Sequence, residues 1–390
     1  MKICSAICEY NPFHNGHLKH IEYIKSVIKP DYLVIILSGN FTQRGEIAVT
    51  NKYTRATWAI KAGADAVIEL PTVFATATAE LFASGAIKLI NSINGEKSIC
   101  FGVENNDLSA LTNLANISLN ETPEMQEIIK NELDNGQPFI KARNTAIEKL
   151  YGNSVDVSLL NSPNNVLALE YIKAIIKNGY DISVNAITRS GGGYNDGEVK
   201  ASLSSALAVR NAINNGNVED IKTQVPTYVY NDLPSLLPNL DKEVLYSILT
   251  SSLNDIKGVL ECAEGLENRI KSLVKESLTV NDLLNLLKTK RYTDARLRRI
   301  LLATTLKIKG DFIKKCLNSP LYLKVLAINK NKPEVLSVLS NSTYPVITRK
   351  SDAIKLKGVA KKCFEKDAFA CNLFSVATKT KLNENEMKIV

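Results

Sequence analysis

The first hundred residues alternate short apolar runs with stretches of helical periodicity, and this rhythm restricts the fold more than any other feature of the chain. The apolar runs lie at 3–7, 32–37, 66–70 and 99–101, and the helical stretches lie at about 17–28, 51–62 and 78–92. Strands that alternate with helices form parallel sheets with helices on both faces. We therefore predict an α/β domain with a doubly wound parallel sheet. Ligands of such sheets bind beyond the carboxyl ends of the strands.

The three histidines of the chain, His14, His17 and His20, fall within seven residues, just after the first predicted strand. Gly16 lets the backbone approach a ligand there, and the N–H groups of the new helix point at any phosphate. His14 and His17 are three residues apart and project to one side, where they can offset charge on a reacting phosphate. The sequence therefore predicts a phosphate-binding loop.

Two alternatives exist for these histidines. They could be ordinary turn residues, or they could bind a metal. Successive three-residue steps drift around a helix, so His20 falls behind the other two. Glu9 is the only neighbouring acid before Glu22, and no cysteine pair completes a ligand set. We therefore expect a nucleotide here and no metal held by the protein alone.

The segment Ser38–Glu46 follows the second predicted strand and is rich in amide and hydroxyl groups. Arg44 within it could bind a phosphate or a carboxylate with two parallel hydrogen bonds. The alternative is an ordinary polar loop with a solvated arginine. Because this loop lies at the same edge of the sheet as the histidines, we predict a functional role, with Lys52 and Arg55 as weaker candidates.

The segment His14–His17 resembles the H-x-G-H signature of nucleotidyltransferases and class I aminoacyl-tRNA synthetases. Those families bind ATP at the end of the first Rossmann strand and attack its α-phosphate. Further segments resemble, in order, the bacterial tRNA(Met) cytidine acetate ligase family across nearly the whole chain. They are residues 38–46, 63–71, 101–104, 162–165 and 290–296.

The resemblance implies a Rossmann-like fold of the nucleotidyltransferase type and an ATP-dependent ligase that forms AMP and pyrophosphate. Such an enzyme activates acetate as acetyl-adenylate, with Mg²⁺ bridging the pyrophosphate, and acetylates N4 of the wobble cytidine of elongator tRNA(Met). The resemblance gives His14, His17 and Arg44 the catalytic roles. The expected ATP contacts are Ile7, Cys8, Glu9, Tyr10, Asn11, Pro12, Phe13, His14, Asn15, Gly16, His17, Leu18, Lys19, His20, Gly102, Asn161, Asn164, Arg189 and Ser190.

Four of these contacts also have alternative interpretations. Gly102 ends the fourth apolar run, where a glycine would let an adenine or ribose lie against the backbone, although it could be a plain turn residue. Between Asn161 and Asn164 the sequence does not choose, and Asn165 is also possible. Arg189 precedes three glycines whose spacing does not match a dinucleotide fingerprint, but the loop could still enclose a phosphate.

The segment Ser205–Arg210 resembles the helix start that binds phosphates in nucleotidyltransferases. Leu207 stands where a threonine is usual, which removes a hydroxyl from the side of the β- and γ-phosphates. Ser205 and Arg210 remain candidate contacts.

Charge divides the chain unevenly. Residues 1–210 carry 19 Lys and Arg against 21 Asp and Glu, a net charge of −2, whereas residues 211–390 carry 29 against 19, a net charge of +10. We predict a catalytic domain at 1–214 and a mostly helical, basic, tRNA-binding domain at 215–390. The alternative is a lysine-rich surface without a polyanion partner.

The densest group of cations lies at 288–299. Thr293 is expected to cap a helix whose apolar residues face inward, with Arg296 and Arg299 facing outward. A basic helix with an aromatic residue at its start suits RNA backbone contacts and base stacking, although it could be a solvated face. The predicted RNA contacts are Lys290, Arg291, Arg296 and Arg299.

The remaining expectations concern the whole chain. We expect no signal peptide and no membrane span, and the seven cysteines without a C-x-x-C pair suggest free thiols in the cytoplasm. The oligomeric state is not predicted. Two rival functions remain open: a small-molecule adenylyl- or cytidylyltransferase, and a non-catalytic RNA-binding protein with a nucleotide-binding fold.

Overall fold

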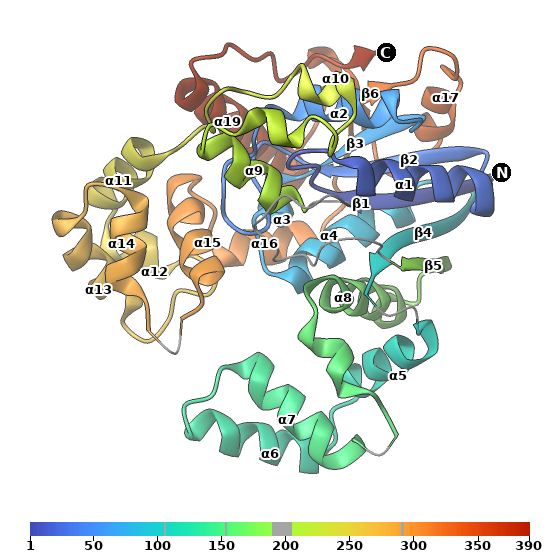
Figure 1. The fold of residues 1–390 in the computed structure, drawn as a ribbon. Helices are drawn as coiled ribbons and strands as arrows, with labels where there is room; N and C mark the ends of the chain where they lie inside the picture. Colours follow the sequence, from blue (N-terminus) through green and yellow to red (C-terminus); the bar gives the residue numbers. More distant parts are fainter. Residues whose placement is uncertain (105–106, 153, 189–204, 290–291) are drawn as a thin grey trace.

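The computed structural model describes residues 1–104, 107–152, 154–188, 205–289 and 292–390 (Figure 1). Within these residues one sheet has the strand order β5-β4-β1-β2-β3-β6-β7, and β8 pairs with β6. Strands β1 to β5 run parallel to one another, which confirms the predicted sheet, and β6 runs antiparallel to β3. The strands are β1 (Lys2–Cys8), β2 (Tyr32–Ser38), β3 (Ala66–Leu70), β4 (Glu96–Val103), β5 (Ile182–Thr188), β6 (Leu323–Ile328), β7 (Val346–Ile347) and β8 (Lys388–Ile389).

The central strands are apolar throughout because helices cover both faces of the sheet. On β2, Leu33 and Ile35 pack into the core shared with α1 and α2, while Val34 and Ile36 pack into the core shared with α4 and α8. Successive side chains of a strand point to opposite faces, so each face needs its own apolar set. The helices are α1 (Asn15–Tyr23), α2 (Lys52–Lys61), α3 (Thr72–Ala75), α4 (Ala79–Ser92) and α8 (Pro163–Asn178).

The helix ends follow local sequence signals. Asn51 accepts hydrogen bonds from the first turn of α2, and Thr78 caps α4. Ser162 caps α8, and Pro163 occupies its first turn. Helix α1 continues as a π-helical turn at Ile24–Ile28, so together they span the stretch that the periodicity predicted.

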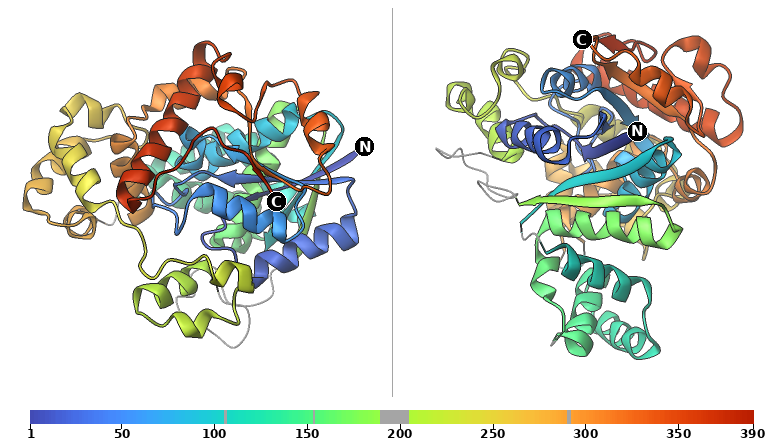
Figure 2. Two further views of the ribbon diagram at one scale, coloured as in Figure 1. Left: turned by 90° about the horizontal axis from the view of Figure 1, so that it is seen from above. Right: turned by 90° about the vertical axis from the view of Figure 1, so that its right-hand side faces the viewer.

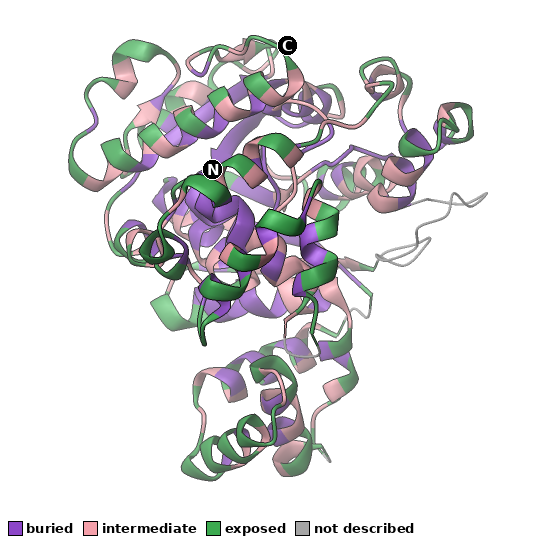
Figure 3. Ribbon diagram, turned by 90° about the vertical axis from the view of Figure 1, so that its left-hand side faces the viewer, coloured by how far each residue is buried: buried purple, intermediate pink, exposed green. Residues whose placement is uncertain are grey.

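Three helices form an arm that extends from the sheet beyond α8. They are α5 (Leu108–Leu119), α6 (Pro123–Asp134) and α7 (Phe139–Tyr151). Figures 1 and 2 show α5 against α8 and the α6–α7 pair farther out. Figure 3 shows that most of the outer surface of this pair is exposed. The short η2 turn (Val157–Asn161) returns the chain to α8.

The back half of the chain contributes helices on two sides. Helices α11 to α15 form a group beside the sheet, while α19 packs against α3 and α16 (Figure 1). The helices are α9 (Ala206–Asn214), α10 (Thr227–Tyr230), α11 (Asp241–Thr250), α12 (Leu253–Lys257), α13 (Leu266–Leu273), α14 (Val280–Leu287), α15 (Asp294–Thr305), α16 (Gly310–Leu317), α17 (Val335–Ser340), α18 (Lys350–Ala353) and α19 (Gly358–Thr378), with the short turns η3 (Val218–Ile221) and η4 (Val274–Glu276).

The sheet does not stop at the predicted domain boundary. Strands β6, β7 and β8 all come from the back half, and β6 covers the edge that β3 would otherwise expose. The segment 323–390 therefore belongs to the sheet rather than to a separate helical body. The boundary between domains at residues 214 and 215 stays a prediction. The sheet contains strands from both sides of this boundary.

Two expectations about the whole chain can be compared with the structure. All seven cysteines are free, and all except Cys8 are buried. No helix in the described part of the chain is long and apolar enough to cross a membrane.

Candidate active site

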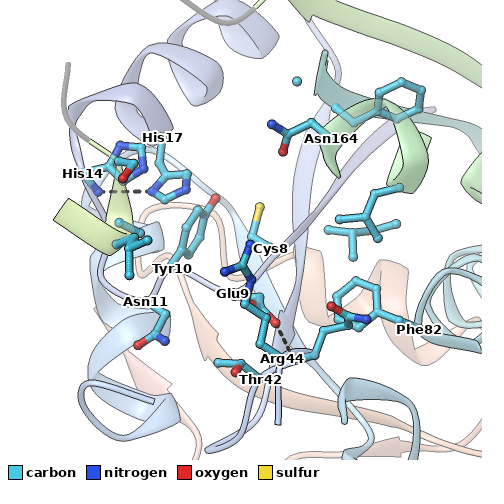
Figure 4. A pocket seen from close by; sticks show the side chains of 18 of the residues that line it. Cys8, Glu9, Tyr10, Asn11, His14, His17, Thr42, Arg44, Phe82 and Asn164 are labelled. Carbon is cyan, nitrogen blue, oxygen red and sulfur yellow. Dashed lines mark hydrogen bonds between the residues drawn. The ribbon is translucent and has the colours of Figure 1, made fainter. Parts of the chain in front are cut away.

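A cavity lies beyond the carboxyl ends of β1 and β4, where the strand alternation placed the candidate site (Figure 4). It gathers segments that are far apart in the sequence: the loop after β1, the loop after β2, the end of β4, and the first turns of α8 and α9. Its lining includes these predicted residues: Ile7, Cys8, Glu9, Tyr10, Asn11, His14, His17, His20, Arg44, Gly102 and Asn164.

His14 and His17 form the N-terminal cap of α1. The Gly16 N–H donates to His14 Nδ1 at 3.1 Å, and the His14 N–H donates to His17 Nδ1 at 3.1 Å. The two rings stack with their centroids 3.7 Å apart. Because each Nδ1 accepts a hydrogen bond, each neutral ring carries its proton on Nε2. The cap therefore fixes both imidazoles as Nε2–H donors at the positive end of a helix.

Gly16 is needed for this arrangement. A β-carbon at this position would lie 2.9 Å from Cε1 of the His14 ring. The Tyr10 ring packs edge-on against two neighbouring rings. Its centroid lies 4.7 Å from that of Phe13 and 4.9 Å from that of His17. Thus Gly16 and Phe13, which do not line the cavity, position residues that do.

The loop after β2 forms a tight turn that brings Arg44 to the cavity. The Thr42 N–H donates to the Glu46 carbonyl at 2.9 Å, and the Gly45 N–H donates to the Thr42 carbonyl at 3.0 Å. The Gln43 N–H donates to Glu9 Oε1 at 2.7 Å and joins this loop to the end of β1. Burial raises the pKa of Glu9, and this hydrogen bond and nearby arginines act in the opposite direction.

The weaker candidates Lys52 and Arg55 do not line the cavity. Arg55 is fully buried and donates to the Glu9 carbonyl at 2.6 Å and to the Ser38 carbonyl at 3.2 Å, so it fixes the ends of β1 and β2. Lys52 is buried between Glu69 and Glu384, each at 2.7 Å. A buried cation needs such partners, and these partners lie in the interior.

The structure separates the three asparagines near α8. Asn164 lines the cavity, and its Nδ2 donates to Glu104 Oε1 at 2.6 Å. Asn165 is buried and accepts the Glu104 N–H at 3.1 Å. Asn161 ends η2 and is not among the lining residues. In Figure 4, Asn164 and Phe82 lie across the cavity from His14 and His17.

The two sulfur atoms near the histidines are not activated. The surrounding protein shields the partly buried Cys8 thiol from water and raises its pKa to about 12, so the thiol is neutral at physiological pH. His20 Nε2 lies 3.3 Å from Cys100 Sγ, and burial raises the pKa of this thiol as well. His20 thus reaches the cavity from α1 without joining the His14–His17 pair.

The start of α9 forms one wall of the cavity. Ser205 caps α9 by accepting the Ala208 N–H at 3.1 Å. Arg210 donates to the Asn11 carbonyl at 2.6 Å, and its second nitrogen lies 3.7 Å from Glu46. Both Ser205 and Arg210 line the cavity together with Leu207, where a threonine was expected from the resemblance.

Several expected residues lie elsewhere. Asn15 is on the outer side of the cap, where its side chain donates to the Thr223 carbonyl at 2.8 Å. The predicted ATP contacts that are not among the lining residues are Pro12, Phe13, Asn15, Gly16, Leu18, Lys19 and Asn161. The predictions for Arg189, Ser190, Lys290 and Arg291 lie outside the described residues.

Sequence reasoning missed part of the lining: Thr42, Gln43, Glu46, Phe82, Phe101, Leu167, Tyr171 and Ala206. The polar residues among them lie in the loop after β2, so their position at the sheet edge was a usable signal. Phe82, Leu167 and Tyr171 continue the apolar periodicity of α4 and α8, and nothing local distinguishes them from core residues.

The prediction that Arg296 and Arg299 face outward from α15 is wrong. Arg296 donates to the Glu261 carbonyl at 2.7 Å and lies over the Tyr292 ring at 4.9 Å. Arg299 forms a paired contact with the Glu261 carboxylate at 2.7 and 2.8 Å, and only 12% of its side chain is exposed. The helix itself, capped by Thr293, is as predicted. The helical periodicity predicted which face of α15 is buried. It could not predict that Glu261, from the turn before α13, would bind both arginines.

Comparisons with known proteins agree with this geometry. Residues 1–388 match the family described as HIGH Nucleotidyl Transferase. The chain is 38% identical to the tRNA(Met) cytidine acetate ligase of Thermoanaerobacter sp. (strain X514), covering 97% of this chain and 96% of the relative. It is 37% identical to the protein of the same name from Clostridium perfringens (strain ATCC 13124), covering 96% and 95%.

Two solved structures are also similar over all of both chains, at 28% identity. They are Thermotoga maritima TmcAL without ligand, with a TM-score of 0.93, and the same protein bound with alpha-thio ATP, with a TM-score of 0.89. Identity and coverage of this extent, together with the paired histidines at the start of α1, show that the chain belongs to the tRNA(Met) cytidine acetate ligase family of HIGH nucleotidyl transferases.

Proposed function

We propose that this chain is an ATP-dependent ligase that activates acetate as acetyl-adenylate and acetylates N4 of the wobble cytidine of elongator tRNA(Met). The paired histidine cap of α1 carries the proposal, because it holds two stacked imidazoles, each an Nε2–H donor, side by side in the lining of the cavity. Donors that are already oriented stabilise developing charge without reorganising during the reaction. The family to which the chain belongs supplies the substrates.

In the first step, a carboxylate oxygen of acetate attacks the α-phosphorus of ATP and pyrophosphate leaves. His14 and His17 would donate through Nε2 to the phosphate oxygens. Arg44 and Arg210, which line the cavity near the histidines, would offset the remaining negative charge.

ATP would enter as its Mg²⁺ complex. In the described part of the chain, no group of three or more His, Cys, Asp or Glu could hold a metal ion. Among the described residues, the carboxylates that line the cavity are Glu9, which accepts the Gln43 N–H, and Glu46, which lies beside Arg210. This suits a cation carried by phosphate oxygens and water, as Mg²⁺ bound to nucleotides usually is. The ion would supply charge neutralisation at the departing pyrophosphate.

In the second step, the exocyclic amine of cytidine attacks the acetyl group and AMP leaves. The mixed anhydride supplies the driving force, so no covalent enzyme intermediate is required. The raised pKa of Cys8, about 12, agrees with this, because its neutral thiol is a poor nucleophile.

The tRNA would lie along the basic back half. Its net charge of +10, against −2 in the front half, supports this part of the proposal. The proposed RNA contacts remain Lys290, Arg291, Arg296 and Arg299 in a domain at 215–390. A cytoplasmic location follows from this substrate and suits the seven free cysteines.

Purified protein with ATP and labelled acetate should form acetyl-adenylate in the absence of RNA, and adding elongator tRNA(Met) should move the label to N4-acetylcytidine. The product is identified by mass spectrometry of the nucleosides. Transfer from acetyl-CoA but not from acetate plus ATP would overturn the proposal. A dinucleotide product from ATP or CTP would favour the small-molecule transferase, and bound ATP without turnover would favour the non-catalytic RNA-binding protein.

A further inference from the structure

A second cavity lies against the ATP cavity, between the front and back halves of the chain. Its volume is about 450 Å³, within the range of small-molecule sites. It is bounded by the loop 45–49, α9, the segment 236–241, α14 and α15. Glu46, Leu207 and Arg210 line both cavities and thus form the wall between them. A group bound in the second cavity would be next to a group bound in the first.

The lining of the second cavity has the chemistry that binds a nucleobase. Leu237, Pro238 and Leu301 supply apolar surface for the faces of a ring. Asn211 and Asn214 bring amide groups from α9, and Arg298 brings a guanidinium group from α15. Unstacked bases of single-stranded RNA are held by contacts to their faces, for which an arginine guanidinium plane is one partner, and by hydrogen bonds to their edges.

Leu207 gives a second reason. The resemblance places a threonine here, whose hydroxyl would serve the β- and γ-phosphates, yet Leu207 is apolar and faces both cavities. An apolar side chain in the wall between the cavities cannot donate a hydrogen bond to a phosphate. It can pack against the apolar edge of a base. The departure from the expected residue is therefore explained if one side of the wall holds a nucleoside.

Glu46 lies in the wall between the two cavities, so its carboxylate is within the lining that a group in either cavity would contact. Its carboxylate lies 3.7 Å from Arg210 and 3.9 Å from Arg298, which is longer than a hydrogen bond. These cations hold the carboxylate in place while its oxygens can still accept a hydrogen bond from a ligand.

We propose that the second cavity binds the acceptor cytidine of the RNA and that Glu46 accepts the N4–H of its base. This rests on the ligase function proposed above. The N4 lone pair forms a bond to the acetyl carbon, and the bond from this carbon to the phosphate oxygen breaks. AMP leaves with that electron pair, and the proton of N4 passes to Glu46. Once its lone pair has bonded to the acetyl carbon, the nitrogen carries a positive charge and is strongly acidic, so a carboxylate suffices as the base.

The test separates the two half-reactions in the full-length protein. Asn214→Trp would fill the second cavity from its exposed rim, and Asn215→Trp is the matched control, one residue beyond and outside both linings. Acetate-dependent exchange of pyrophosphate into ATP reports adenylate formation, and acetylation of an elongator tRNA(Met) transcript reports transfer. Asn214→Trp should keep exchange and lose transfer by roughly tenfold or more, while Asn215→Trp should keep both.

Glu46→Gln should lower transfer by roughly 10²-fold more than it lowers exchange, because the loss of a general base usually costs a factor of this size. Full transfer by Asn214→Trp, or loss of exchange together with transfer, would overturn the cavity assignment. Full transfer by Glu46→Gln would overturn the role of Glu46. Absence of exchange and transfer in the wild-type protein would instead refute the proposed ligase function.

Discussion

At the scale of single residues, the histidines that define the site also begin the helix that carries them. A capping box normally uses a short polar side chain at the cap and Glu or Gln three residues later. Here two imidazoles do this, through their Nδ1 atoms. The same hydrogen bonds that begin α1 thus decide which ring nitrogen carries the proton available to a phosphate.

His17→Ala should therefore affect both rate and stability. Losing one oriented donor should lower acetate-dependent pyrophosphate exchange by ~10²–10³-fold. Losing half of the cap should cost about 1 kcal/mol of unfolding free energy, measured by denaturant titration. In His17→Gln the amide oxygen can still accept the His14 N–H, so stability should recover more than rate. Full exchange activity in His17→Ala would remove His17 from catalysis.

At the scale of elements, the loop after β2 is held against α15. Gly45 has a φ of +78°, and a β-carbon there would lie 2.6 Å from backbone atoms of both Arg298 and Arg299. The loop that places Arg44 in the ATP cavity therefore rests directly on the helix of the back half. Only glycine permits both the conformation and the approach.

A comparison of Gly45→Ala with Gly216→Ala should separate the requirement for a positive φ from the requirement for close approach to α15. Gly216 also has a positive φ, +75°, but nothing lies within 4 Å of its β-carbon position. Gly216→Ala should cost ~1–2 kcal/mol for conformation alone. Gly45→Ala should cost a further ~1–3 kcal/mol for the displaced helix and should raise the KM for ATP. Equal losses in denaturant titrations, with unchanged KM, would show that the loop does not depend on α15.

At the scale of the whole molecule, the two halves share one interior. Strand β6 completes the sheet, and the buried charges of Lys52, Glu69, Lys324 and Glu384 join α2, β3 and β6 to the C-terminal segment. Glu261 similarly connects the turn before α13 to Arg299 of α15. A cation of the back half can therefore be part of the structure and of the proposed RNA surface.

Arg299→Glu alone should lower the melting temperature, because it places two carboxylates together. The exchanged pair Arg299→Glu with Glu261→Arg should recover stability and pyrophosphate exchange. If Arg299 also contacts RNA, the exchanged pair should still bind tRNA more weakly, with the log–log salt dependence reduced by about one unit. Wild-type affinity and slope in the exchanged pair would limit Arg299 to a structural role. The exposed Lys314 and Lys315 of α16 would then be tested next.

The sequence by itself determined the features that depend on neighbouring residues. Apolar runs and helical periodicity gave the parallel strands β1 to β4 and the helices α1, α2 and α4 between them. The cap residue Thr293 placed the start of α15, because a cap acts within three residues. The position of His14, His17 and Arg44 at one edge also followed, since parallel strands end on the same side.

Tertiary structure alone decided what depends on distant partners. β3 pairs with a strand that begins more than 250 residues later, and Arg299 is neutralised by a carboxylate 38 residues away. Periodicity records whether a side chain is buried but not what it meets, so it could not show that Phe82 lines a cavity or that Arg55 holds backbone carbonyls. For the same reason, the wall that Glu46, Leu207 and Arg210 form between two cavities exists only in the folded chain.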